Sequence, residues 1–124
     1  MVGNKSIAVR KRILFVDDDP AILRVLSRVL REQHRWEQVF ALGGEAGLLE
    51  LRTSAFDLLI TDLQMPSING IDLLAVAKRE SPRTARMLLT GSIVDATTID
   101  ASLVLAKPPG LKELTAAIES LLVG

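Results

Sequence analysis

Short runs of apolar residues alternate along this chain with longer segments in which apolar residues recur every three to four positions. A short continuous apolar run is typical of a strand buried on both faces, and the longer spacing is typical of a helix with one buried face. The pattern predicts strands at 13–16, 36–42, 56–61, 86–90 and 103–106, and helices at 20–31, 45–54, 71–80 and 111–121.

The predicted strands and helices alternate throughout the chain, without repeats or a linker that would divide two domains. Alternation of this kind predicts an α/β fold with a parallel sheet, right-handed crossovers and helices on both faces. Ligands of such folds bind beyond the carboxyl ends of the strands. Polar residues lie at four of these ends, and they are the candidates for chemistry: Asp17 with Asp18, Asp62, Thr90 and Lys107.

Asp17 and Asp18 follow the first strand, and Asp62 follows the third. If these strands are neighbours, their ends lie about 5 Å apart, and three carboxylates at that distance repel one another. Oxygen ligands without histidine or cysteine favour Mg²⁺ or Mn²⁺ over Zn²⁺. Acids at a helix start also favour the helix dipole, but the second strand end makes a metal site the better interpretation.

A carboxylate such as Asp62 can act as a nucleophile toward phosphorus and form an aspartyl phosphate. The transferred phosphoryl group carries spread negative charge, which a metal ion and the ammonium group of Lys107 can balance. Thr90 offers a hydroxyl donor, and Gly91 leaves room for the phosphate. Each residue alone is unremarkable, and the prediction rests on their occurrence together.

The charge balance, the lack of cysteine and the short apolar runs argue against several classes of function. Lysine and arginine number 15, as do aspartate and glutamate, which argues against direct binding of nucleic acid or a membrane surface. There is no cysteine, which excludes disulfides and a cysteine nucleophile. The apolar run 13–16 is too short for a signal peptide or a membrane span. We expect a cytoplasmic protein with a flexible tail at 1–11 and one domain at 12–124.

Four segments together resemble the receiver domains of response regulators, and the resemblance covers roughly residues 12 to 122. They are Ile13–Pro20 with its acids, Asp57–Pro66 with Asn69-Gly70 beyond it, Leu88–Gly91, and Ala106–Pro109. The resemblance implies a flavodoxin-like, doubly wound sheet of five parallel strands in the order 2-1-3-4-5. It also implies a Mg²⁺-dependent switch that a sensor histidine kinase or a histidine phosphotransfer protein phosphorylates.

The resemblance assigns a role to each matching residue. Asp62 matches the phospho-acceptor, Asp18 the direct Mg²⁺ ligand, and Asp17 the acid that acts through water. Gln64 matches the position whose backbone carbonyl completes the metal shell. Thr90 matches the switch hydroxyl and Lys107 the lysine that pairs with the phosphate.

Two further matches concern positions around these residues. Lys107-Pro108 matches a bond that is commonly cis in the family. Gln64 and Ser92 match positions that tune loss of the phosphate, and neither is acidic. The resemblance implies that such a domain catalyses only its own phosphorylation and dephosphorylation. We therefore do not expect an enzyme with a separate substrate.

The chain departs from the family at two places. Val104 stands where an aromatic residue usually does, and the distance from Thr90 to Lys107 is shorter than usual. The segment 94–102 has poor helix formers, so we expect a fourth helix that is short, irregular or replaced by a loop. We expect the surface around 92–102, with strand five, to read out phosphorylation.

Three short segments resemble those of receivers that precede HDOD or HD-GYP output domains: Arg35-Trp36, Arg86–Gly91 and Ala106–Pro109. The sequence does not contain such a domain, so the downstream element is either another protein or a C-terminal output domain outside these 124 residues.

Other functions with this strand pattern fit less well. An FMN binder needs a Ser/Thr/Gly-rich phosphate loop after the first strand, where this chain has acids. A haloacid-dehalogenase-type phosphatase needs Asp-x-Asp, which Asp62-Leu63-Gln64 lacks, and the Gly-Lys-Ser/Thr element of P-loop enzymes is missing. The remaining alternative is a receiver-like interaction module that works without phosphorylation, which Val104 and the short fourth-helix region would suit.

Overall fold

The structure is a computed structural model that describes residues 10–92 and 94–122. Its elements alternate strictly between strand and helix, except for a single 3₁₀ turn, η1, before the last strand. In chain order they are β1 (Lys11–Asp17), α1 (Pro20–Val29), β2 (Trp36–Leu42), α2 (Gly44–Thr53), β3 (Leu58–Thr61), α3 (Gly70–Glu80), β4 (Ala85–Thr90), η1 (Ala96–Thr98), β5 (Leu103–Ala106) and α4 (Leu111–Leu122).

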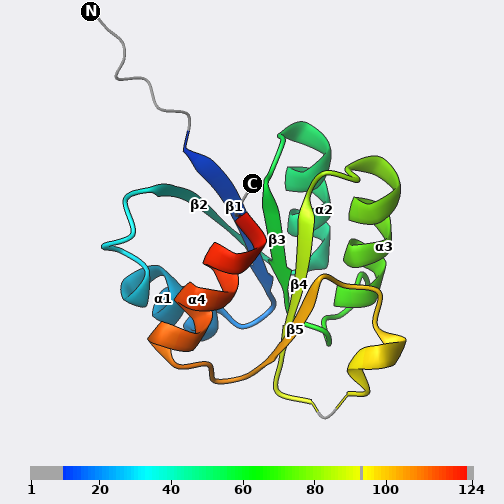
Figure 1. Cartoon of the computed structure of the whole chain (residues 1–124). Coiled ribbons are helices and arrows are strands. Elements are labelled where there is room, and N and C mark those ends of the chain that lie inside the picture. The colour runs from blue at the N-terminus through cyan, green and yellow to red at the C-terminus, as the bar shows by residue number, and fades with distance from the viewer. Residues whose placement is uncertain (1–9, 93, 123–124) are drawn as a thin grey trace, which may run out of the picture.

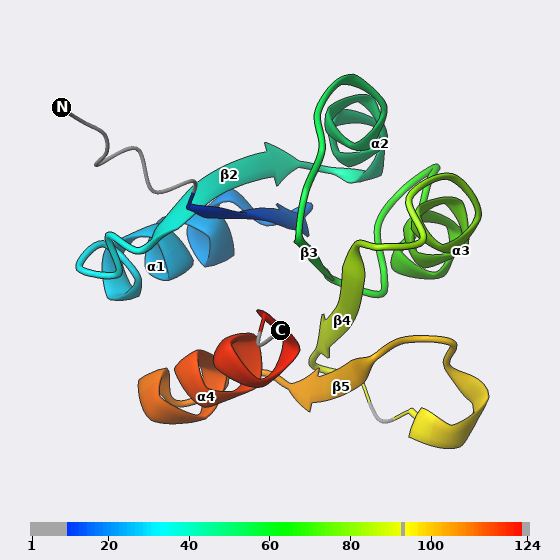
Figure 2. The same cartoon turned by 45° about the horizontal axis from the view of Figure 1, so that its top comes forward.

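The five strands form one parallel sheet in the order β2-β1-β3-β4-β5, which confirms the expected fold class. Helices α1 and α4 cover one face, and α2 and α3 cover the other (Figures 1 and 2). In the register of the two central strands, Val16 of β1 is paired with Thr61 of β3. The residues that follow each of them therefore come out at the same edge of the sheet.

Strand β1 lies between the two helix layers and is buried on both faces. Ile13 and Phe15 pack in the core under α1 and α4, whereas Leu14 and Val16 pack in the core under α2 and α3. All four are at most 2% exposed. This explains why the strand is apolar at every position instead of alternating.

Several boundaries differ from the prediction. Lys11 belongs to β1 and pairs with Trp36 of β2, so it is not part of a tail. Residues 1–9 of the predicted tail lie outside the described part of the chain. Phe56 is buried but lies before β3, which begins at Leu58. The Asp57 main chain donates to the Arg12 carbonyl at 2.8 Å, and the Arg12 main chain donates to the Asp57 side chain at 2.8 Å. Because a side chain takes one of these two hydrogen bonds, regular strand pairing starts only after Asp57.

The apolar face of α1 is only partly a core face. Leu26 and Leu30 are buried, as the pattern predicts. Val29 has the helical spacing of the same face, which predicts that it is buried, but it is 39% exposed, and Val25 is 54% exposed. Helical spacing alone put Val29 inside. In the structure α1 ends there, and its last turn borders an open groove shared with the loop before α4.

The described residues of the connection between β4 and β5, 91–92 and 94–102, contain no α-helix, in agreement with the prediction that the fourth helix is short, irregular or replaced by a loop. The only helical turn described there is η1. Asp95 caps this turn by accepting hydrogen bonds from the Thr97 main chain at 3.0 Å and from its hydroxyl at 2.7 Å. Threonine and aspartate compete with helical hydrogen bonds in this way, so the segment closes into a short turn.

The start of α3 is fixed by a capping box that the sequence analysis did not single out. The Asn69 side chain accepts from the Asp72 main chain at 2.9 Å, and the Asp72 side chain accepts from the Asn69 main chain at 3.1 Å. The helix therefore begins at Gly70, and its first turn sits directly under the main chain of Asp62.

We expect Gly70→Ala to destabilise the protein by about 1–3 kcal/mol, the usual range for overpacking. A Cβ at this position would lie 2.0 Å from the carbonyl oxygen of Asp62, and main chain cannot move aside as a flexible side chain can. Urea unfolding measures the loss. Gly110→Ala is the matched control, since a Cβ there meets nothing within 4 Å. Equal losses in the two variants would contradict the steric argument.

Candidate functional site

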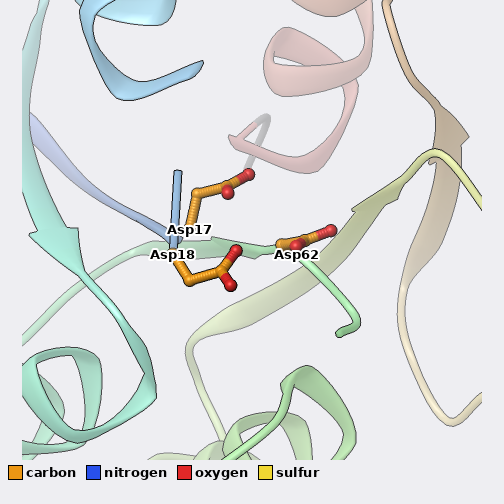
Figure 3. A group of neighbouring side chains, drawn as sticks. All are labelled: Asp17, Asp18 and Asp62. Atoms are coloured by element: carbon orange, nitrogen blue, oxygen red, sulfur yellow. The ribbon is translucent and has the colours of Figure 1, made fainter. Parts of the chain in front are cut away.

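Three carboxylates meet at the carboxyl edge of the sheet. Asp17 ends β1, Asp18 follows it, and Asp62 follows β3, so their side chains converge on one space (Figure 3). Each offers a carboxylate oxygen within 4.8 Å of the others. Asp17 is 3% exposed, Asp62 is half-buried, and Asp18 is exposed. The cluster is therefore open to solvent on the side of Asp18.

The fourth charged group is Lys107, which follows β5. Its ammonium nitrogen lies 2.6 Å from Oδ2 of Asp17 and 3.1 Å from Oδ1 of Asp62. The main chain of Lys107 donates to the carbonyl of Thr90 at 2.9 Å, which ties the lysine to the end of β4. The expected cis bond between Lys107 and Pro108 is present. Two of the three carboxylates thus share one cation.

The close packing of these charged groups raises the pKa values of Asp62 and Lys107. Burial raises the pKa of Asp62, and the charge of Asp17 adds to this, against the hydrogen bond from Lys107. Burial works to lower the pKa of Lys107, but its hydrogen bonds with Asp17 and Asp62 outweigh that effect and the pKa is raised. Lys107 therefore remains a cation at neutral pH, available to an incoming anion.

Asp17 is held in place by more than its charge. Besides the contact with Lys107, its carboxylate accepts a hydrogen bond from the Asp19 main chain at 2.9 Å. Asp19 in turn caps α1 by accepting from the Ala21 main chain at 2.9 Å. We did not anticipate that Lys107 would contact Asp17, because residues 90 positions apart give no local signal in the sequence.

Thr90 ends β4 and is 3% exposed. Its hydroxyl oxygen accepts a hydrogen bond from the Ser92 main chain at 3.1 Å, and among the described residues it makes no hydrogen bond with Asp62. A hollow of about 310 Å³ lies beside it, lined in part by Val94, Val104 and Lys107. Val104, which takes the place of the usual aromatic residue, leaves this space unfilled by a ring.

Gln64 lies in the loop between β3 and α3 and is exposed. The loop is fixed at both ends: Met65 is buried, and the Gly70 main chain donates to the carbonyl of Leu63 at 2.8 Å. Ser67 within it adopts a φ of 68°, a conformation that costs energy in any residue but glycine. The role of the Gln64 carbonyl stays a prediction.

The donor set suits a hard divalent cation. It consists of carboxylate oxygens only, and three acids beside one lysine leave an excess of negative charge. Asp18 makes no ion pair in the part of the chain that the structure describes, so it is free to bind a metal ion from the open side. Mg²⁺ prefers a few carboxylates and retains water, which fits an edge of this kind.

A family model for the response regulator receiver domain matches residues 13–119. The chain is a response regulator receiver domain. Receiver domains are signalling modules of two-component systems, phosphorylated in a Mg²⁺-dependent reaction by histidine kinases or phosphotransfer proteins. Membership of this family confirms the resemblance drawn from the four sequence segments.

Relatives of similar size and solved structures agree with this. The response regulator receiver protein CpdR of Brucella abortus is 32% identical over 118 residues, covering 91% of this chain and 98% of the relative. The signal receiver domain of an HD domain-containing protein from Pseudomonas fluorescens Pf-5 superposes with a TM-score of 0.84 at 31% identity, covering 91% of this receiver and 94% of that chain.

A third similarity concerns a structure with a metal. The response regulator TrrA of Thermotoga maritima, solved in complex with Mg²⁺-BeF, has a TM-score of 0.79 and 30% identity, covering 90% of this receiver and 99% of that chain. Other relatives are longer: this receiver spans 32% and 35% of the length of two of them and 49% of a third. No helix in the described residues is long and apolar enough to span a membrane.

Proposed function

We propose that this receiver accepts a phosphoryl group on Asp62 and changes conformation in response. The observation that carries the proposal is the convergence of Asp17, Asp18, Asp62 and Lys107 at one edge of the sheet. The Asp62 carboxylate is half-buried, and outside its own loop its ion pair is with the Lys107 side chain, so an oxygen of this carboxylate can face a donor.

In the proposed reaction an oxygen of Asp62 attacks phosphorus of the donor's phosphohistidine. The new O–P bond forms as the P–N bond breaks, and the electron pair of that bond stays on the imidazole nitrogen, which takes up a proton. Catalysis of this transfer consists of positioning and countercharge. The domain promotes only its own phosphorylation and dephosphorylation and has no separate substrate.

Lys107 supplies countercharge from this chain. Its ammonium group lies between Asp17 and Asp62, so a small movement brings it to the oxygens of a phosphoryl group on Asp62. Thr90 donates its hydroxyl to the same group once it turns away from Ser92. Asp17, Asp18, Asp62 and the carbonyl of Gln64 would hold Mg²⁺. A bound Mg²⁺ would neutralise charge that develops on the transferred group.

The phosphodonor in this proposal is a sensor histidine kinase or a histidine phosphotransfer protein in the cytoplasm. The phosphorylated receiver then controls a partner protein or an output domain beyond these residues. An output domain of the HDOD or HD-GYP kind is part of this proposal, and its support is one structurally similar receiver that comes from an HD domain-containing protein. Direct contact with nucleic acid is not part of the proposal, because the chain has no net charge.

We expect the protein to gain one phosphoryl group when incubated with acetyl phosphate and Mg²⁺, and none when a chelator replaces Mg²⁺. Without the cation, the transferred group would meet three carboxylates and one ammonium group, and the repulsion would suppress the transfer. Intact-mass spectrometry measures the gain. A folded protein that gains no phosphate with Mg²⁺ would overturn the proposal.

That negative outcome would favour a receiver that acts as an interaction module without phosphorylation. Val104 and the single turn η1 are the features that favour this second candidate, because both alter the region expected to respond to phosphate. The complete set of acids and lysine favours the first.

A further inference from the structure

The connection between β4 and β5 is fixed near its end by Asp100. The Asp100 carboxylate forms an ion pair with Lys78 of α3, and a second one with Arg86 of β4, whose nitrogen lies 3.4 Å away. The same Arg86 nitrogen donates to the carbonyl oxygen of Asp100 at 2.5 Å. One residue of the connection is thus joined both to the sheet and to the helix layer that covers it.

Asp100 lies between a part of the connection that is hydrogen-bonded to β4 and a part that makes no hydrogen bonds to elements beyond Thr90 among the described residues. Beyond it, Ser102 is bonded to the Arg86 main chain twice, at 2.7 and 3.0 Å. Before it, the hydrogen bonds of the described residues from Gly91 to Ile99 all stay within the connection or return to Thr90. Ile99 packs against the core under α2 and α3, and the Asp100 contacts are the first polar contacts from the Thr90 side that anchor the connection to other elements.

The two ends of this connection carry the residues that a phosphoryl group would attract. Thr90 precedes it and Lys107 follows β5, and the main chains of these two residues are hydrogen-bonded at 2.9 Å. The Thr90 hydroxyl also accepts from the Ser92 main chain. Turning that hydroxyl toward a phosphoryl group on Asp62 breaks the bond with Ser92 and frees the start of the connection to move.

We propose that Asp100, Lys78 and Arg86 form a latch that holds the connection in its unphosphorylated arrangement and so opposes phosphorylation of Asp62. The proposal rests on the proposed function and adds a regulatory contact to it. The side chains of Asp100 and Lys78 are 65% and 59% exposed, and ion pairs at exposed sites are weak. A weak contact can be broken by the modest free energy that one phosphoryl group supplies, which a switch requires.

Arg86 is the member of the latch that is anchored in the sheet. Its side chain is only 16% exposed, and it extends from a strand in the sheet. Hydrogen bonds with Lys78 and Arg86 lower the pKa of Asp100, with Lys78 as the larger cause, so the carboxylate is charged at neutral pH. The latch is therefore closed under the conditions in which the receiver works.

Asp100→Asn tests the latch, because it removes the charge and keeps the size of the side chain. We expect its initial rate of labelling by acetyl phosphate with Mg²⁺ to exceed that of the wild type by about two- to fivefold, from the range measured for exposed ion pairs. Lys78→Gln removes only the pair with α3 and should give a smaller increase. High salt should narrow the difference by weakening the latch of the wild type.

The matched control is Glu80→Gln. It removes exposed ion pairs that do not touch the connection: Arg52 of α2 donates two hydrogen bonds to Glu80 of α3 at 2.9 and 3.0 Å, and Arg79 donates one at 3.3 Å. We expect wild-type labelling from this variant. Labelling of Asp100→Asn at the wild-type rate or slower would overturn the latch.

Amide hydrogen exchange of the unphosphorylated protein separates this proposal from the proposed function. Residues 94–102 should exchange faster in Asp100→Asn than in the wild type and in Glu80→Gln. Unchanged exchange would overturn the latch even if the wild type is labelled normally. A wild type that takes no label would overturn the proposed function, and the exchange result would still decide whether Asp100 holds the connection.

Discussion

Asp62→Asn should abolish phosphorylation, with labelling by acetyl phosphate reduced by more than about a hundredfold, while the fold is kept. An amide is not a nucleophile toward phosphorus, and no other carboxylate of the cluster lies in the same position. The amide oxygen of asparagine can still face the ammonium group of Lys107, which lies 3.1 Å from Oδ1 of Asp62 in the wild type. The loss is therefore chemical and not structural.

The same variant should be more stable than the wild type in the presence of a chelator. The wild-type cluster places three carboxylates within 4.8 Å, and removing one charge relieves their repulsion. Mg²⁺ should stabilise the wild type and narrow this difference, because the cation compensates for the charge that the variant lacks. Thermal unfolding with Mg²⁺ and with chelator measures both effects.

Asp57→Asn is the matched control for the acceptor. Asp57 lies before β3, away from the cluster, and its carboxylate accepts a hydrogen bond from the Arg12 main chain at 2.8 Å, which asparagine can also do. This variant should label as the wild type does. If Asp62→Asn labelled at the wild-type rate, the acceptor would be another residue.

Lys107→Met should have the second-largest effect, lowering labelling by about a hundredfold, the loss typical when one group that stabilises transition-state charge is removed. Without its ammonium group, the transferred phosphoryl group loses the only cation that this chain brings to Asp62 among the described residues. Intact mass after acetyl phosphate and Mg²⁺ measures the loss.

Lys107→Met should also change stability in the direction opposite to Asp62→Asn. Asp17 is 3% exposed and would lose the cation that lies 2.6 Å away. A carboxylate left without its partner at such a site destabilises a protein by about 1–3 kcal/mol. Mg²⁺ should restore most of this stability and bind more tightly than to the wild type, since Lys107 no longer competes for the same carboxylates.

Lys112→Met controls for the loss of a lysine as such, because Lys112 is exposed on α4. Its labelling and its stability in chelator should match the wild type. A Lys107→Met protein that is as stable as the wild type in chelator would show that the contact with Asp17 does not contribute to the fold.

The apolar pattern of the chain was enough to predict the fold class and the alternation of strands and helices. The continuous apolar runs are the signature of strands buried on both faces, and the structure buries all of Ile13–Val16 between two helix layers. The sequence also indicates which residues lie at the carboxyl ends of the strands, because four of the five strands end in a change from apolar to polar residues. The weak helix formers of 94–102 predicted a fourth helix that is short, irregular or replaced by a loop, and the structure has the single turn η1 there.

Boundaries and faces required the tertiary structure. Helical spacing placed Val29 inside, but what a side chain contacts depends on the neighbouring elements, and at the end of α1 there is an open groove. Phe56 has the composition of a strand residue, yet hydrogen bonding by the adjacent Asp57 delays the start of β3 until Leu58.

Which charged groups pair with one another could not be predicted from sequence positions. Lys107 and Asp17 are 90 positions apart, and Asp100 is 22 positions from Lys78. Attraction between charges depends on their separation in space and on burial, neither of which sequence distance reveals. The strand order 2-1-3-4-5 brings Asp17, Asp62 and Lys107 of this receiver to one edge of the sheet. There Lys107 forms ion pairs with both carboxylates, and the two carboxylates repel each other.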